Sequence, residues 1–168
     1  LIYDVTRNEE QYLQAISGKT AELYATSCRI GGIVGGAERD VINRLTEFGH
    51  AYGMAFQVVD DILDLVATDE ELGKPSGNDI REGVYTLPVI RMIESGHPVK
   101  ELLGGPLDEE TRDQARAAIV NGPEIASSIE TAQNFVNRAL STVEDLPATP
   151  GVQGMRDAAT NLLSALNR

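Results

Sequence analysis

The chain has 168 residues, of which 42% are hydrophobic and 24% are charged, and its net charge is −12. This length suffices for one medium-sized domain, and so acidic a protein lacks the basic surface that general nucleic-acid binding requires. No apolar run approaches the length of a transmembrane segment, so no membrane-spanning helix is expected. The single cysteine, Cys28, excludes an internal disulfide and fits a reducing compartment, which predicts a cytoplasmic protein.

The first predicted elements are helices, because apolar residues recur at helical spacing and β-type alternation never persists. We expect a helix over residues 8–30 that bends near Ser17-Gly18-Lys19 and is stopped by the glycine pairs Gly31-Gly32 and Gly35-Gly36. Residues 37–67 form the longest periodic segment. Residues 68–85 are rich in acidic residues, glycine and proline, which predicts a loop.

Helical patterns return after this loop. Thr86 and Asp108 are the expected N-caps of two helices, and the PATPG stretch at residues 147–151 is an expected turn. The predicted helices are 86–96, 108–121, 124–146 and 155–166. The fold class is therefore all-α, a bundle of roughly six helices joined by short turns and one longer loop.

The long helix carries a stripe of polar side chains. On a helical wheel they fall within an arc of about 100°, and apolar residues take most of the rest; they are Gln57, Asp60, Asp61 and Asp64. Gly53, one turn earlier, lies on the same stripe and is expected to leave open space beside it. No lysine or arginine follows Arg44 on this helix, so the carboxylates need cations from elsewhere.

Two interpretations of the stripe remain open. It is either a narrow solvated face of an amphipathic helix or a site for a hard divalent cation. Mg²⁺ prefers oxygen ligands and is typically held by one or two carboxylates together with substrate phosphates. The apolar residues on both flanks favour the metal site, since they suit the lining of a cavity.

Two lysines stand in segments where they could face a bound anion. Lys74 lies in the glycine-bracketed stretch Gly73–Gly77, shortly before Asp79, where a diphosphate held by the metal would need further positive charge. Lys19 lies at the expected helix bend in Ser17-Gly18-Lys19-Thr20. This tetrapeptide is no P-loop, because Leu13 occupies the position of the first glycine and no strand precedes it. For either lysine, plain surface exposure is the alternative.

Together these segments resemble the trans-isoprenyl diphosphate synthases, the polyprenyl synthetase family. The matching stretches are GKTAELYATSCRIGG (18–32), GMAFQVVDDILDL (53–65) and GKPSGNDIREGVYTLPVI (73–90). Their order and spacing match the C-terminal half of that family. The resemblance implies a helical bundle of the isoprenoid synthase type, with residues 1–168 forming the C-terminal half of a single such domain.

The resemblance also implies a reaction and a cofactor. An allylic diphosphate would ionise, the alkene of isopentenyl diphosphate would attack in a 1'-4 condensation, and a proton would be lost. Asp60 would ligate a Mg²⁺ bound to the allylic diphosphate, with Asp64 supporting the ion and Asp61 lying behind these ligands. Asp79 would orient the Lys74 loop or the waters on the metal.

The same resemblance assigns the substrate contacts. Lys19 and Lys74 would bind the diphosphate oxygens. Thr20 and Gln57 would line the site near the reacting carbons, and Phe56 would contact the isopentenyl unit. The two histidines are interpreted without a chemical role: His50 as a hydrogen-bonded helix residue and His97 as an exposed turn residue.

Several features depart from the family. Its first aspartate-rich motif and its N-terminal basic site are absent from this sequence, and Val84 stands where members often have lysine. Because the chain also begins at Leu1 rather than methionine, we expect a fragment that is inactive alone. The DIREGVYTLPVI stretch resembles that of medium- and long-chain synthases more than that of farnesyl synthases. Family members are usually homodimers, so the resemblance also implies a homodimer. The alternatives are a non-catalytic partner subunit of a heteromeric synthase and a plain helical interaction module.

Overall fold

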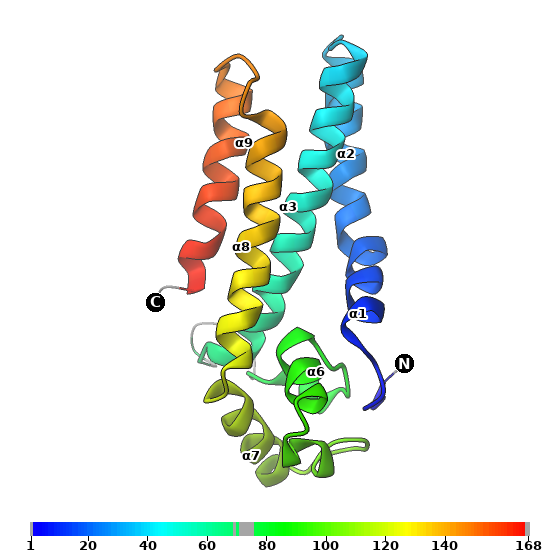
Figure 1. Ribbon diagram of the computed structural model, residues 1–168, viewed down its shortest axis with the longest axis vertical. Coiled ribbons are helices and arrows are strands. Elements are labelled where there is room, and N and C mark those ends of the chain that lie inside the picture. Colours follow the sequence, from blue (N-terminus) through cyan, green and yellow to red (C-terminus); the bar gives the residue numbers. More distant parts are fainter. Residues whose placement is uncertain (1, 69, 71–75, 167–168) are drawn as a thin grey trace. The chain divides into compact units, whose positions relative to one another are not determined.

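The computed structural model describes residues 2–68, 70 and 76–166, and these residues contain helices and no strand (Figure 1). The all-α prediction is therefore confirmed. The α-helices are α1 (Glu9–Ile16), α2 (Glu22–Val34), α3 (Arg39–Val66), α5 (Asn78–Arg81), α6 (Leu87–Glu94), α7 (Glu109–Val120), α8 (Glu124–Val143) and α9 (Pro150–Asn161). Three shorter elements are a π-helix, η1 (Ser17–Ala21), and the 3₁₀ helices η2 (Pro98–Glu101) and η3 (Leu162–Leu166).

The helices divide into two compact units. The first comprises Leu1–Tyr12 and Asp60–Ile129, and the second comprises Leu13–Val59 and Glu130–Arg168. Helices α1, α3 and α8 each contribute residues to both units. Among the described helices, none combines the length and the hydropathy that crossing a membrane requires.

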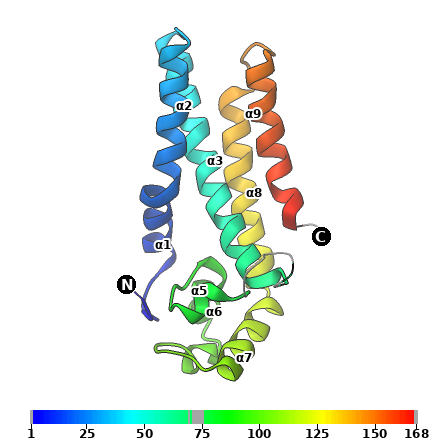
Figure 2. The ribbon, with the colours of Figure 1, turned by 180° about the vertical axis from the view of Figure 1, so that it is seen from behind.

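The second unit is built on close contacts between helices. Figure 2 shows α2 lying along α3, and α9 along α8. The core brings Phe48, Ala51 and Ala55 of α3 together with buried residues of α8 and α9: Val136, Ala139, Val143 and Ala159. Small residues at these positions let the helices approach, so this unit depends on tight packing more than on large side chains.

Gly53 is part of this close packing, which corrects the prediction of open space beside it. A Cβ atom on Gly53 would lie 2.7 Å from the Cα of Ala21, and one on Gly49 would lie 2.5 Å from the carbonyl oxygen of Tyr24. The backbone of the neighbouring helix therefore occupies the space that a side chain would need. These two glycines are where α3 meets η1 and α2.

The first unit holds the N-terminal segment against α6 and the loop before it. The backbone N–H of Tyr3 donates to the carbonyl of Gly83 at 2.7 Å, and Arg7 Nη1 donates to the carbonyl of Tyr85 at 3.0 Å. Glu9 and Arg91 form a two-pronged ion pair with distances of 2.7 and 3.0 Å. The fully buried side chains of this unit include Ile62, Leu65, Ile80, Tyr85, Leu87 and Ile90.

Two predicted helix ends are wrong. Helix α2 continues through Gly31-Gly32, because Gly32 packs against Ile42 and Leu45 and tertiary contact outweighs the low helix propensity of glycine. It ends at Val34, so only the second predicted glycine pair, with Gly35 at the C-cap, stops it. The last helix begins at Pro150 rather than 155, so part of the expected turn is helical. Thr149 caps it by accepting a hydrogen bond from the N–H of Val152 at 3.3 Å.

Other local predictions have mixed outcomes. Asp108 caps α7 as expected, accepting from the N–H of Thr111 at 2.8 Å. Thr86 stands at the N-cap position of α6 without a side-chain cap. Within the expected loop 68–85, residues Asn78–Arg81 form the helical turn α5. His97 is exposed, as predicted.

Candidate functional site

The predicted bend between α1 and α2 is a π-helical turn, Ser17–Ala21. Such turns are rare and frequently occur at functional sites. Lys19 is exposed on it, and the Thr20 hydroxyl donates to Gln57 Oε1 of α3 at 2.7 Å. Ser17 Oγ and His50 Nε2 form a second hydrogen bond at 2.9 Å, which confirms His50 as a hydrogen-bonded helix residue. The second unit thus brings Thr20 and Gln57 together.

An aromatic group lies on the same unit. Phe56 is 37% exposed, and its ring centroid lies 5.6 Å from that of Tyr24 and 6.5 Å from that of Tyr52. Gln57, the next residue, is buried. Phe56 can therefore present one side of its ring to an apolar group while the two tyrosines hold it in place.

In the first unit, the last turns of α3 carry Asp60, Asp61 and Asp64, which we call the acidic turn. Asp60 is exposed, whereas Asp61 and Asp64 are only 6% and 4% exposed. A solvated face is therefore excluded for two of the three carboxylates. Burial disfavours a charged carboxylate unless hydrogen bonds or cations offset the lost hydration.

Asp61 receives one such hydrogen bond from Tyr12 of α1. The tyrosine hydroxyl donates to Asp61 Oδ2 at 2.7 Å, and the Tyr12 side chain is 1% exposed. Burial raises the pKa of the Tyr12 hydroxyl, and the negative charge of Asp61 raises it further, so the hydroxyl stays protonated and donates. Sequence reasoning missed Tyr12, because an apolar helix face containing one tyrosine gives no indication of a partner 49 positions away.

Asp64 is hydrogen-bonded to the second half of the predicted loop, residues 68–85. Its Oδ2 accepts from the backbone N–H of Asp79 at 3.0 Å, and its carbonyl accepts from the N–H of Gly77 at 2.7 Å. Gly77 has φ +68°, a left-handed conformation that favours glycine. Two of the predicted metal-site residues, Asp64 and Asp79, are thus held side by side. Lys74 lies outside the described residues, so its role remains a prediction.

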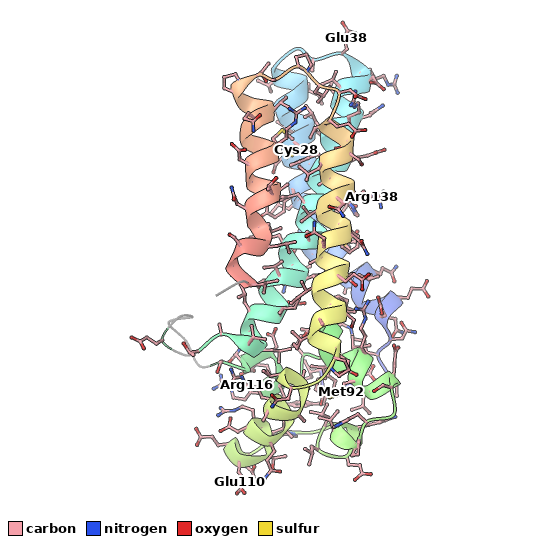
Figure 3. All side chains as sticks on the ribbon, turned by 60° about the vertical axis from the view of Figure 1, so that its left-hand side comes forward. Cys28, Glu38, Met92, Glu110, Arg116 and Arg138 are labelled. Carbon is pink, nitrogen blue, oxygen red and sulfur yellow. The ribbon has the colours of Figure 1, made fainter. Side chains whose placement is uncertain are left out.

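The electrostatics of the acidic turn call for positive charge. The turn lies at the C-terminal end of α3, where the helix dipole already gives partial negative charge. Arg116, which Figure 3 labels on α7, offsets part of it by donating to the carbonyls of Leu65 at 2.8 Å and Ala67 at 3.1 Å. These bonds reach the carbonyls at the helix end, and the side chain of Asp60 is exposed.

The described residues fit a metal ion shared with a substrate better than a metal held by protein alone. Within residues 2–68, 70 and 76–166, no three histidine, cysteine, aspartate or glutamate side chains lie close enough to hold an ion together. The donors present are carboxylate oxygens, one of them exposed. This set suits Mg²⁺, which keeps several waters and commonly takes one or two carboxylates plus phosphate oxygens.

Comparison with known proteins identifies the family of the chain. Residues 2–121 match the family model described as Polyprenyl synthetase. The geranylgeranyl diphosphate synthase of Saccharolobus solfataricus is 37% identical over 151 residues, which are 87% of this chain and 45% of that protein. The heptaprenyl diphosphate synthase component 2 of Geobacillus stearothermophilus is 37% identical over 152 residues, or 88% of this chain and 47% of that protein.

Solved structures show the same fold. The heptaprenyl diphosphate synthase of Staphylococcus aureus superposes with a TM-score of 0.92 at 24% identity, covering 97% of this chain and 52% of that one. A polyprenyl synthase of Caulobacter crescentus, solved in complex with calcium and isoprenyl diphosphate, gives 0.89 at 28% identity, covering 96% and 51%. The chain spans about half the length of the relatives it matches. The matched family model and the identity to these relatives show that the chain belongs to the polyprenyl synthetase family.

Proposed function

We propose that residues 1–168 form the C-terminal half of a single isoprenoid synthase domain, in a polyprenyl diphosphate synthase. The enzyme would condense isopentenyl diphosphate with an allylic diphosphate in a Mg²⁺-dependent 1'-4 reaction. The observation that carries the proposal is the acidic turn, where Asp61 and Asp64 are buried and hydrogen-bonded while Asp60 is exposed. A turn that serves only stability gains nothing from three carboxylates at the negative end of a helix.

Each candidate site residue of the first unit has a defined role in this proposal. Asp60 would ligate the metal, and Asp64 and Asp79 would support it from the hydrogen-bonded pair that they form. Asp61 would lie behind them. Bound Mg²⁺ would supply positive charge to the diphosphate leaving group, whose expulsion is the difficult step. Lys74 would add a further cation to the diphosphate oxygens.

The second unit would supply the remaining substrate contacts. Lys19, exposed on the π-helical turn, would bind diphosphate oxygens. The Thr20 hydroxyl donates to the amide oxygen of Gln57, and this bond would fix the orientation of the amide dipole near the reacting carbons. Phe56 would contact the isopentenyl unit through its exposed edge.

The proposal extends to product length and assembly. The DIREGVYTLPVI stretch supports a medium- or long-chain product, and the relatives include synthases named heptaprenyl and nonaprenyl. We propose a homodimer, which the exposed apolar side chains of α2 support: Leu23, Ile30, Ile33 and Val34.

The second candidate function is a non-catalytic partner subunit of a heteromeric synthase, favoured by the two relatives named component 2. The hydrogen-bonded acidic turn weighs against it, since such a subunit does not need it.

Incorporation of labelled isopentenyl diphosphate into a solvent-extractable product tests the proposal. Geranyl, farnesyl and geranylgeranyl diphosphates serve as primers, with and without Mg²⁺. We expect no product from the 168-residue chain alone, and product when it is fused behind the N-terminal half of the Saccharolobus solfataricus relative. Asp60→Asn in the same fusion should lower turnover by about 100-fold or more. Equal turnover of the two fusions would refute the assignment of Asp60 and favour the partner-subunit function.

A further inference from the structure

Tyr12 joins the N-terminal segment to the acidic turn through a buried hydrogen bond. It is among the largest fully buried side chains of the described chain, and its hydroxyl reaches Asp61 Oδ2 at 2.7 Å. Both residues belong to the first unit. A buried tyrosine hydroxyl and a buried carboxylate satisfy each other, so losing either partner leaves the other with an unmet requirement.

The position of Tyr12 is itself fixed by neighbouring residues. The guanidinium of Arg7 lies 5.5 Å from the centre of the Tyr12 ring and also donates to the carbonyl of Tyr85 at 3.0 Å. One turn before Tyr12, Glu9 is held by its two-pronged pair with Arg91. The hydroxyl therefore approaches Asp61 from a site with little freedom to move.

This contact has a consequence for the neighbouring carboxylate. Successive residues of an α-helix point about 100° apart. With Asp61 held on the buried side by Tyr12, Asp60 is directed to the exposed side of the same turn. The hydrogen bond to Tyr12 also occupies one oxygen of Asp61, which keeps that oxygen from competing for a cation bound at Asp60.

We propose that Tyr12 is a positioning residue for metal and diphosphate binding, because its hydroxyl holds Asp61 in place and thereby keeps Asp60 facing outward. The inference rests on the proposed function, since it assigns to Tyr12 a part in the same site. It concerns a side chain that touches neither metal nor substrate and acts only through Asp61.

The chain offers a matched control for the loss of a buried tyrosine hydroxyl. Tyr85 is 1% exposed, belongs to the same unit, and its hydroxyl accepts from the backbone N–H of Gly104 at 2.8 Å. Tyr85→Phe and Tyr12→Phe each remove one buried, hydrogen-bonded hydroxyl and leave the ring in place. The two variants differ in the partner that is lost: Tyr12 bonds to Asp61 of the acidic turn, whereas Tyr85 bonds to Gly104.

The experiment uses the ¹⁵N-labelled chain, with Mn²⁺ and inorganic diphosphate as the probe. Paramagnetic broadening of the amide signals of residues 60–66 and 79 gives an apparent dissociation constant even for weak binding. We expect Tyr12→Phe to weaken binding by about tenfold, the effect typical of groups that orient metal ligands. Tyr85→Phe should stay within about twofold of wild type, and Tyr12→Phe should have no further effect in an Asp61→Asn background.

Each alternative result overturns a distinct statement. Affinity within about twofold of wild type for Tyr12→Phe would overturn the inference and leave the proposed function intact. Equal weakening by both tyrosine variants would also overturn it, because general loss of stability would then explain the effect. If the wild-type chain shows no broadening near Asp60, the proposed function and the inference fall together.

Discussion

Replacing Gly53 by alanine is expected to destabilise the second unit, although alanine is the better helix former. A Cβ at this position would lie 2.7 Å from Ala21 Cα, 3.0 Å from Tyr24 Cδ2 and 3.3 Å from Tyr24 Cβ. Carbon atoms in favourable contact are about 3.5–4.0 Å apart, so the added methyl group must displace backbone rather than a flexible side-chain end. Overpacking of this kind costs up to about 3 kcal/mol, and alanine recovers about 1 kcal/mol of helix propensity. The free energy of unfolding should therefore fall by roughly 2 kcal/mol.

Urea unfolding followed by far-ultraviolet circular dichroism measures this change. Gly154→Ala is the matched control, because Gly154 lies in the exposed interior of α9 and nothing lies within 4 Å of its added Cβ. That variant should be more stable than wild type by about 0.5–1 kcal/mol. If Gly53→Ala proves as stable as Gly154→Ala, the close approach of η1 and α3 described above is wrong.

Three further changes have defined outcomes. Asp108→Ala should lower the melting temperature at neutral pH, since the hydrogen bonds from Thr111 hold the pKa of Asp108 below its usual value. That contribution is present above the ordinary aspartate pKa and is lost as pH falls through the lowered one, so melting curves of the two proteins should converge in acid. Burial raises the pKa of the Cys28 thiol, so its alkylation by iodoacetamide at pH 8 should be slower than that of a short cysteine peptide, and equal rates would contradict this. In the fusion enzyme, Thr20→Val should lower turnover by about tenfold through loss of the bond to Gln57, whereas Thr20→Ser should retain activity; equal turnover would remove Thr20 from the site.

Local patterns predicted much of the fold. Apolar periodicity over residues 37–67 indicated the helix that the structure places at Arg39–Val66, and Asp108 signalled the start of α7. These features depend on neighbouring residues, which the sequence displays directly. The acidic turn was recognised for the same reason, since its carboxylates lie within five positions on one helix.

The errors concern contacts between segments far apart in the chain. Gly32 and Gly53 indicated a helix stop and an open space, whereas both are positions where another helix packs closely. Whether a glycine ends a helix or lets a second helix pack closely depends on that second helix. A helical wheel shows only one helix, so it cannot distinguish the two cases. Tyr12 was missed for the same reason, because the hydrogen-bond partner of its hydroxyl, Asp61, lies on another helix.

The π-helical turn changes the phase of the whole N-terminal helical run. Buried side chains follow one another at Ile16, Ala21 and Ala25, a step of five residues across the turn and then a step of four. A wheel drawn through α1 and α2 as one continuous α-helix would assign one of the two halves to the wrong face by about 100°. The additional residue lets both halves bury their own side while Lys19 stays exposed between them. The π-helical turn absorbs this residue without rotating either half, so deleting one residue from Ser17–Ala21 would restore one continuous α-helix that keeps both buried faces and loses the turn that carries Lys19.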